Sequence, residues 1–136
     1  MSIIAEAKQS IFDLAELAGG SPDPVSLIGV QARLVRLHAE LGQEMAAKFK
    51  GKERAYISRK LAQAKEYQKG RLPGEHRLTA ADATEAAILA VGEEWAAEID
   101  TAAEYEGYRT LLRSLQNAID YGRTLISFYK SSEHHS

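Results

Sequence analysis

Two long stretches of this 136-residue sequence, 24–69 and 79–130, carry apolar side chains at every third or fourth position and contain no proline after Pro24. That spacing places the apolar side chains in one stripe along an α-helix. At about 1.5 Å per residue, the first stretch is a helix of roughly 70 Å. Because such a helix is longer than a small globular domain is wide, we expect the long helices to bury their apolar stripes against each other.

A shorter amphipathic helix is predicted before these two stretches, over residues 3–18. Gly19 follows it and is typical of a helix stop in the left-handed conformation. Asp23 and Pro24 then resemble an N-cap followed by proline at the first helical position. Two arrangements are compatible with the sequence of this helix. It packs across the long helices of its own chain, or it joins a neighbouring copy.

The clearest turn of the sequence lies at 70–74, where Gly, Arg, Leu, Pro and Gly follow one another. Thr79 with Asp82 three residues later resembles a capping box and predicts the start of the next helix. Two long helices joined by a tight turn form a hairpin. We therefore predict a single all-α domain over residues 1–136, built as a long antiparallel helical hairpin with a short N-terminal helix.

A helical hairpin has a narrow core, so oligomerisation is expected to bury the remaining apolar surface. The stripe of the first long helix is interrupted around Gly51, between Lys50 and Arg54. A kink or a solvated segment is expected there, because glycine costs about 1 kcal/mol relative to alanine inside a helix. The positions expected in the core or in contacts between copies are Leu34, Leu37, Leu41, Ile88, Trp95, Ile99, Leu112, Ile119 and Ile126.

The formal net charge of −2 hides a sharp division of charge along the chain. Residues 31–77 hold twelve Lys and Arg against five Asp and Glu, whereas residues 78–108 hold eight acidic residues and no Lys or Arg. A chain segregated in this way is expected to have an anionic partner, a cationic partner, or a second copy of itself.

The composition and the spacing of the polar residues exclude several kinds of catalytic and metal site. The sequence has no cysteine, which excludes disulfide scaffolds, thiolate zinc sites and cysteine nucleophiles. Glu93, Glu94 and Glu98 have the wrong spacing for the magnesium site of all-helical nucleotide pyrophosphohydrolases, and no histidine follows a glutamate by three positions, as carboxylate-bridged iron bundles require. No serine lies in a nucleophile elbow, and no phosphate-binding loop is found. We predict no enzymatic activity, no metal and no cofactor.

The basic residues concentrate at the end of the first long helix, with aromatic residues among them. Lys and Arg neutralise phosphates and release counterions, and aromatic rings stack on unpaired bases without reading sequence. An alternative stays open, in which these charges face solvent or pair with the acidic residues of 78–108 and the aromatic residues pack in the core. The residues predicted to bind DNA are Lys48, Lys50, Lys52, Arg54, Tyr56, Arg59, Lys60, Lys65, Lys69 and Arg71.

Three segments of the sequence resemble the UvsY-like recombination mediator proteins of tailed phages. They are the basic helix from Glu44 to Lys69, the turn Tyr67-Gln68-Lys69-Gly70, and the stretch Ile119–Ile126 near the end. The resemblance implies a non-enzymatic, ring-forming protein that binds single-stranded DNA. It also implies that the protein helps to load a strand-exchange recombinase onto DNA covered by single-strand-binding protein.

Two other functions are compatible with the same charge pattern. Basic and acidic segments can pair between copies in an oligomeric scaffold, or in an inhibitor of a host protein, with no nucleic-acid role. A helical assembly can also hold a small anionic ligand between its subunits.

The expected location follows from two features that the sequence does not show. The N-terminus lacks a basic region followed by a long apolar core, and no stretch approaches the ~18 uninterrupted apolar residues that span a bilayer. A cytoplasmic protein with no membrane partner is expected, in the host cytoplasm if a phage encodes it.

Overall fold

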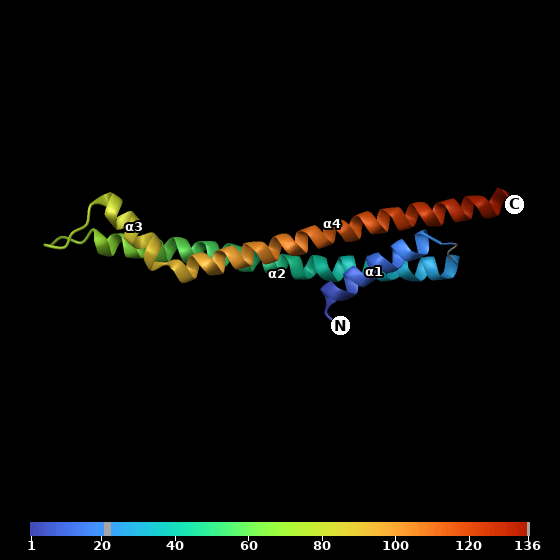
Figure 1. Ribbon diagram of the computed structural model, residues 1–136, viewed down its shortest axis with the longest axis horizontal. Coiled ribbons are helices and arrows are strands. Elements are labelled where there is room, and N and C mark those ends of the chain that lie inside the picture. The colour runs from blue at the N-terminus through green and yellow to red at the C-terminus, as the bar shows by residue number, and fades with distance from the viewer. Residues whose placement is uncertain (21–22, 136) are drawn as a thin grey trace. The chain divides into compact units, whose positions relative to one another are not determined.

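The computed structural model describes residues 1–20 and 23–135, with side chains through residue 132. Within these residues the chain forms four α-helices and no strand (Figure 1), which confirms the all-α prediction. None of the helices in the described residues is long and apolar enough to cross a membrane. The helices are α1 (Ile3–Ala18), α2 (Pro24–Gly70), α3 (Ala80–Ala90) and α4 (Gly92–His135).

Side-chain caps begin three of the helices. The Ser2 hydroxyl accepts a hydrogen bond from the Ala5 N–H at 3.1 Å at the start of α1. At the start of α2, the Asp23 carboxylate accepts the Val25 N–H at 3.2 Å, as the sequence predicts. The Thr79 hydroxyl accepts the Asp82 N–H at 3.1 Å before α3, which is one half of the predicted capping box. These bonds satisfy backbone donors that have no partner inside the helix.

Glycines end α1 and shape the turn after α2. Gly19 follows α1 in the right-handed conformation, with φ −78°, so the predicted left-handed stop is wrong. In the turn, the Leu78 N–H donates to the Gly70 carbonyl at 2.8 Å, and the Arg71 guanidinium donates to the Leu78 carbonyl at 2.8 Å. Gly74 has a φ of 146°, a conformation that favours glycine.

The predicted helix over 79–130 is wrong in its continuity, because the structure divides it at Val91. Val91 has φ −107° and ψ 32°, which end α3, and α4 begins at Gly92 and continues to His135. Glycine is a poor helix former and a common site of helix bends, so the break falls where the helix is intrinsically weakest.

Of the kink or solvated segment expected between Lys50 and Arg54, the structure shows exposed side chains at Lys50, Glu53 and Arg54, and α2 passes through Gly51 without a break. Packing on both sides of this glycine accounts for the continuity. The Lys48 ammonium contacts the Glu104 carboxylate, and Lys52 lies over the Tyr105 ring. Tertiary contacts of this kind outweigh intrinsic helix propensity.

The sequence predicts a single domain, whereas the structure contains two compact units, to both of which α2 and α4 contribute. Unit 1 comprises Met1–Ala46 and Gly107–Ser136, and unit 2 comprises Ala47–Glu106. Each unit therefore holds one part of α2 and one part of α4. α1 belongs to unit 1, and α3 belongs to unit 2.

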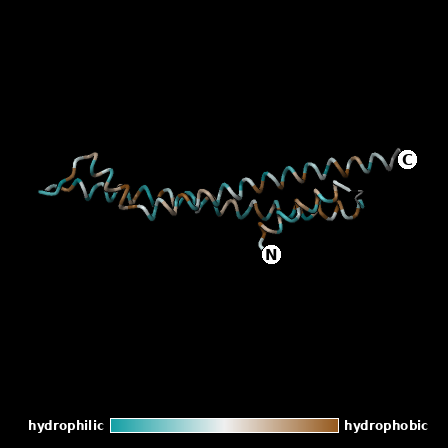
Figure 2. Tube along the Cα trace, in the orientation of Figure 1, coloured by the Kyte–Doolittle hydropathy of each residue, from teal (hydrophilic) through white to brown (hydrophobic). Residues whose placement is uncertain are grey.

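Unit 1 has a core of leucines and other apolar side chains from three helices. Arg33 pairs with Asp13 at 3.0 Å and Arg36 pairs with Glu6 at 2.6 Å, so α1 packs against the α2 of its own chain. Figure 2 shows apolar positions recurring along α1, α2 and α4 in this unit. The buried core residues are Ala7, Leu14, Leu27, Val30, Leu34, Leu37, Leu41, Leu111, Leu115, Ala118 and Ile119.

One close approach in unit 1 depends on a glycine. The Gln31 amide donates a hydrogen bond to the Ile119 carbonyl at 2.8 Å, across the interface between α2 and α4. Gly122 is buried next to this amide, and a Cβ atom at position 122 would collide with Gln31 Oε1. Glycine therefore leaves the space that the Gln31 side chain occupies.

Unit 2 buries much smaller apolar side chains. Its buried apolar residues are Ala83, Ala87 and Val91, all from α3 or its end. A Cβ atom at Gly70 would lie 3.1 Å from Leu78 and 3.2 Å from Ala83, so the end of α2 lies very close to the start of α3. The large apolar residues that stay exposed in this unit are Phe49, Tyr56, Ile57, Leu61, Leu72, Ile88, Leu89 and Ile99.

The nine positions expected in the core or between copies fall into three groups. Leu34, Leu37, Leu41 and Ile119 are buried in unit 1. Trp95, Leu112 and Ile126 are half-buried. Ile88 and Ile99 are 42% and 62% exposed, so they lie outside the core of the single chain.

Candidate functional site

The residues predicted to bind DNA all lie in unit 2. Nine of them are on α2, and Arg71 follows directly after its last residue. Residues 47–70 hold eight Lys and Arg against two acidic residues, whereas residues 80–106 hold eight acidic residues and no Lys or Arg. The direction in which each basic side chain points therefore decides whether it meets an acid within the unit.

Two of the basic residues face the acidic stretch of α4 and are neutralised there. The Lys48 ammonium lies 2.5 Å from a Glu104 carboxylate oxygen. Arg59 forms a two-point ion pair with Glu98, with nitrogen–oxygen distances of 2.7 Å and 3.2 Å. For these two positions, pairing within the chain is the correct interpretation of the basic segment.

Arg59 is the centre of a structural cluster. Its guanidinium lies 4.0 Å from the centroid of the Trp95 ring, and it also donates to the Gln63 side-chain oxygen at 3.2 Å. The side chains of Arg59 and Glu98 are only 11% and 17% exposed. The hydrogen bond between them lowers the pKa of Glu98 and raises the pKa of Arg59. Two-point carboxylate pairing and stacking on an aromatic face both use the planar guanidinium, so Arg59 holds α2 to α4 within unit 2.

The last two basic residues of the segment also have partners in the chain. The Lys69 ammonium lies 3.0 Å from a Glu66 carboxylate oxygen, and the Arg71 guanidinium binds the Leu78 carbonyl. They stabilise the end of α2 and the turn that follows it.

Three other basic residues point away from α4. Lys50, Arg54 and Lys65 have no side-chain partner among the residues that the structure describes. Steps of three and four residues connect them through Ile57 and Leu61, so all five lie on one face of α2. We call Lys50, Arg54, Ile57, Leu61 and Lys65 the outer face of α2. Ile57 and Leu61 are 53% and 67% exposed.

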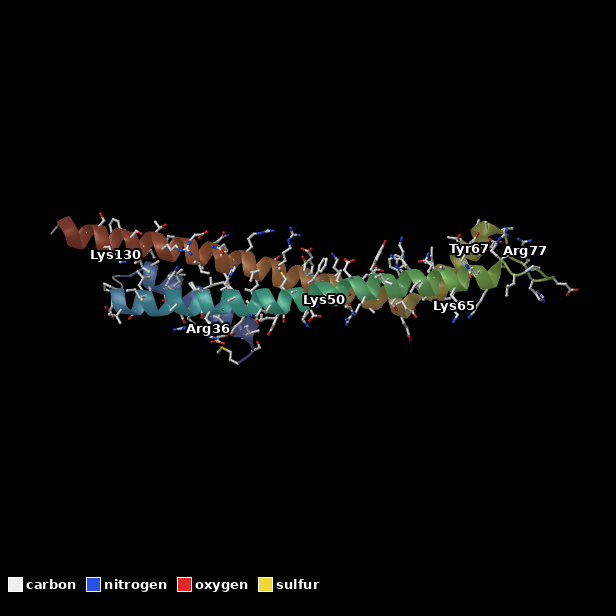
Figure 3. All side chains as sticks on the ribbon, turned by 180° about the vertical axis from the view of Figure 1, so that it is seen from behind. Arg36, Lys50, Lys65, Tyr67, Arg77 and Lys130 are labelled. Carbon is white, nitrogen blue, oxygen red and sulfur yellow. The ribbon has the colours of Figure 1, made fainter. Side chains whose placement is uncertain are left out.

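Figure 3 labels Lys50 and Lys65 on this helix and shows Lys65 on the edge of α2 away from α3, with Tyr67 on the side toward α3. Residues two positions apart along an α-helix point about 200° away from each other, which accounts for the opposite directions of Lys65 and Tyr67. The outer face is therefore a surface on which cations flank an apolar centre.

The aromatic residues of the segment have contacts within unit 2. The Phe49 ring packs against the Tyr105 ring, with centroids 5.6 Å apart. Lys60 and Arg59 both lie over the Tyr56 ring, at 5.2 Å and 5.3 Å from its centroid. Phe49 and Tyr56 thus have contacts within the unit, and Tyr67 lines a cleft between α2 and α3.

A cleft of about 410 Å³ lies between α2 and α3, and we call it the α2–α3 cleft. The sequence did not indicate it, because it exists only where α3 lies over the last turns of α2. The glycine at position 70, which allows the close approach of Leu78 and Ala83, is the sequence feature that could have pointed to it. The residues that line it are Arg59, Lys60, Gln63, Ala64, Tyr67, Gln68, Thr84 and Ala87.

In the described part of the chain, no group of three or more His, Asp and Glu side chains is placed to hold a metal ion. No protein-family model matches this chain, and no curated protein or solved structure matches it either.

Proposed function

We propose that this chain is a non-enzymatic protein that binds single-stranded DNA along the outer face of α2. The observation that carries the proposal is the placement of Lys50, Arg54 and Lys65 on one helix face without a partner in the described residues. Unpaired Lys and Arg side chains bind phosphates and release the counterions condensed on the strand.

The composition of the outer face favours a single strand over a duplex. Ile57 and Leu61 lie between the cations and are more than half exposed. A single strand exposes the apolar faces of its bases, whereas a duplex presents mainly phosphates and narrow base edges. Apolar contact at the centre with phosphate contact on either side matches a strand that lies along the helix.

We further propose that the two long helices form an antiparallel hairpin and that several copies assemble into an oligomer. Exposed Ile88 and Ile99 in unit 2 supply apolar surface for contacts between copies. Assembly also matters for affinity, because three cations per copy bind a strand weakly, whereas linked copies bind with avidity.

The cellular role that we propose is that of a recombination mediator. It rests on the resemblance of residues 25–130 to the UvsY-like proteins, whose function implies a strand-exchange recombinase and a single-strand-binding protein as partners. In this role the chain holds a strand for another protein to occupy, which requires a phosphate-binding surface and no catalytic group.

The test is a titration of a labelled single-stranded oligonucleotide at several salt concentrations, read by fluorescence anisotropy. Three phosphate contacts per copy predict a slope of about −2 in log affinity against log salt for each copy engaged. Charge reversal of the outer face, K50E with R54E and K65E, is expected to weaken binding by more than about tenfold, because each phosphate contact is replaced by repulsion.

A matched control reverses three exposed cations of unit 1, with K8E, R113E and K130E. This control makes the same change in net charge and is expected to retain most of the binding. Equal binding by the outer-face variant and the wild type, or binding without a salt slope, would refute the proposal.

A second candidate is an oligomeric scaffold with no nucleic-acid role. The observation that favours it is the exposed apolar surface of α3 and α4, where Ile88, Leu89 and Ile99 lie among eight acidic residues. Sedimentation of the outer-face variant separates the two candidates. Loss of the oligomer identifies the outer face as a contact between copies, whereas an intact oligomer that no longer binds DNA supports the mediator.

A further inference from the structure

We infer that the α2–α3 cleft receives a base of the bound strand, so that each copy holds one nucleotide by its base as well as by its phosphates. The inference rests on the proposed function, because it requires a strand on the outer face of α2. It adds a binding site that the charge of the segment does not indicate.

The first support is position. The cleft residues Lys60, Ala64 and Gln68 follow one another in steps of four along α2. Ala64 and Gln68 lie three and seven residues after Leu61, so they belong to the edge of the outer face. The cleft therefore opens beside the surface on which we place the strand, and a base can turn into it while its phosphates stay on the cations.

The second support is the chemistry of the walls. The Tyr67 ring and the methyl groups of Ala64 and Ala87 supply apolar surface, and the amides of Gln63 and Gln68 supply hydrogen-bond donors and acceptors. Ligand pockets of a few hundred Å³ combine mainly apolar walls with a few polar groups in this way. A planar heterocycle with polar edges fits such walls better than a bare phosphate does.

The third support is charge. The Arg59 guanidinium at the cleft is already paired with Glu98, so it cannot serve as a free anion site. Lys60 at the same cleft has an exposed side chain. One cation at the rim suits the phosphate that is attached to an inserted base, and no carboxylate of the described residues lines the cleft.

Two other clefts lack this combination. A cleft of about 270 Å³ is lined by Glu53 and Glu98 in addition to Tyr56, and one of about 550 Å³ in unit 1 is lined by Asp13 and Glu16. Carboxylates at both sites repel the phosphates that flank a base. The α2–α3 cleft therefore suits a base better than these two clefts do.

The experiment compares two oligonucleotides of equal length, one of thymidines and one with abasic sites, by fluorescence anisotropy on the full chain. Stacking and contact of one base contribute about 1–3 kcal/mol, which is a preference of roughly 5- to 150-fold for the oligonucleotide with bases. We expect the wild-type chain to show that preference and to bind both oligonucleotides with the same salt slope.

Two variants of opposite volume change test the cleft. A64F fills it from an exposed position on α2, and Y67L removes the ring that a base would contact. Both are expected to reduce the preference for the oligonucleotide with bases to the part that contact of the bases with Ile57 and Leu61 supplies. A39F, at an exposed alanine of α2 in unit 1, is the matched control and is expected to keep the preference. Circular dichroism checks that each variant keeps the helical content of the wild type.

The outcomes separate this inference from the proposed function. If A64F and Y67L keep the full preference for bases, the cleft is not the base site and the inference is overturned, while salt-dependent binding leaves the proposed function intact. If neither oligonucleotide binds the wild type at low salt, the proposed function fails and takes the inference with it. If A64F changes the oligomeric state in sedimentation and leaves the base preference unchanged, the cleft holds a protein side chain, which also overturns the inference.

Discussion

Unit 1 and unit 2 use the same two long helices but bury very different side chains. Unit 1 encloses Leu27, Leu34, Leu37 and Leu41 of α2, each with no exposed surface. Unit 2 encloses alanines and one valine, and a cluster of Arg59, Glu98 and Trp95 holds α2 to α4 there. The comparison teaches that one helix can bury large apolar side chains in its first half and leave them exposed in its second.

The difference has an energetic consequence. A fully buried leucine contributes about 1.5–3 kcal/mol, whereas an alanine has little apolar area to bury. Unit 1 is therefore expected to carry most of the folding free energy. Unit 2 leaves large apolar and charged side chains at the surface, which is the property that a protein needs where it binds a partner.

The largest expected effect is the loss of a core leucine from unit 1. Leu37→Ala is expected to lower the free energy of unfolding by about 2–5 kcal/mol, because it removes a fully buried side chain and leaves a cavity. Leu61→Ala in unit 2 is the control and is expected to change it by less than about 0.5 kcal/mol, because Leu61 is mostly exposed. Urea unfolding followed by circular dichroism measures both, and equal losses would contradict the contrast between the units.

The next effect concerns the two glycines of α4 in unit 1. Gly107→Ala is expected to stabilise the helix by about 0.5–1 kcal/mol, because nothing lies near the added Cβ atom. Gly122→Ala displaces the Gln31 amide, which loses its hydrogen bond to Ile119, worth about 1 kcal/mol. We expect Gly122→Ala to be less stable than Gly107→Ala by about 1–2 kcal/mol.

A second substitution checks the cause of this difference. In a Gln31→Ala background the amide is gone, so the two glycine variants should unfold at nearly the same urea concentration. If the difference persists without Gln31, the close approach at Gly122 has another origin.

The smallest expected effect is the pH dependence of unit 2. The hydrogen bond from Arg59 lowers the pKa of Glu98 in the folded chain below its ordinary value of 4.5. The unfolded chain therefore binds a proton more readily, and the stabilisation by Glu98 is present above that ordinary value and is lost as the pH falls through the folded pKa. Glu98→Gln is expected to unfold with a shallower dependence on pH in this acidic range. Thermal unfolding of both proteins between neutral and acidic pH measures it, and parallel profiles would show that Glu98 does not contribute.

Much of the helical architecture was predictable because its causes are local. The bounds of α1 and α2 follow from apolar spacing, from the Asp23 cap and from the turn at 70–74. The break at Val91 was not predictable from spacing, because the apolar stripe continues across it, and Gly92 alone does not mark it, because α2 continues unbroken through Gly51. The helix stays unbroken at Gly51 because the contacts of Lys48 with Glu104 and of Lys52 with Tyr105 compensate for the low helix propensity of glycine. Such contacts between helices cannot be predicted from local spacing either.

The candidate site divides in a similar way between what spacing shows and what packing adds. The excess of basic residues over 47–70 is evident from the sequence, and so is the spacing that joins Lys50, Arg54 and Lys65 on one face. The pairing of Arg59 with Glu98, 39 residues away, depends on how α2 and α4 meet. The α2–α3 cleft likewise needs two helices, so no single stretch of sequence contains it.

The sequence by itself determined that the chain is helical, where its first helices begin, and that basic and acidic residues lie in separate stretches. These properties depend on interactions between residues within a few positions of each other. Only the tertiary structure decided which basic side chains form ion pairs with acidic ones. Lys48 and Lys50 are identical in chemistry and two residues apart, yet α4 lies against one face of α2, so Glu104 neutralises Lys48 whereas Lys50 stays on the outer face.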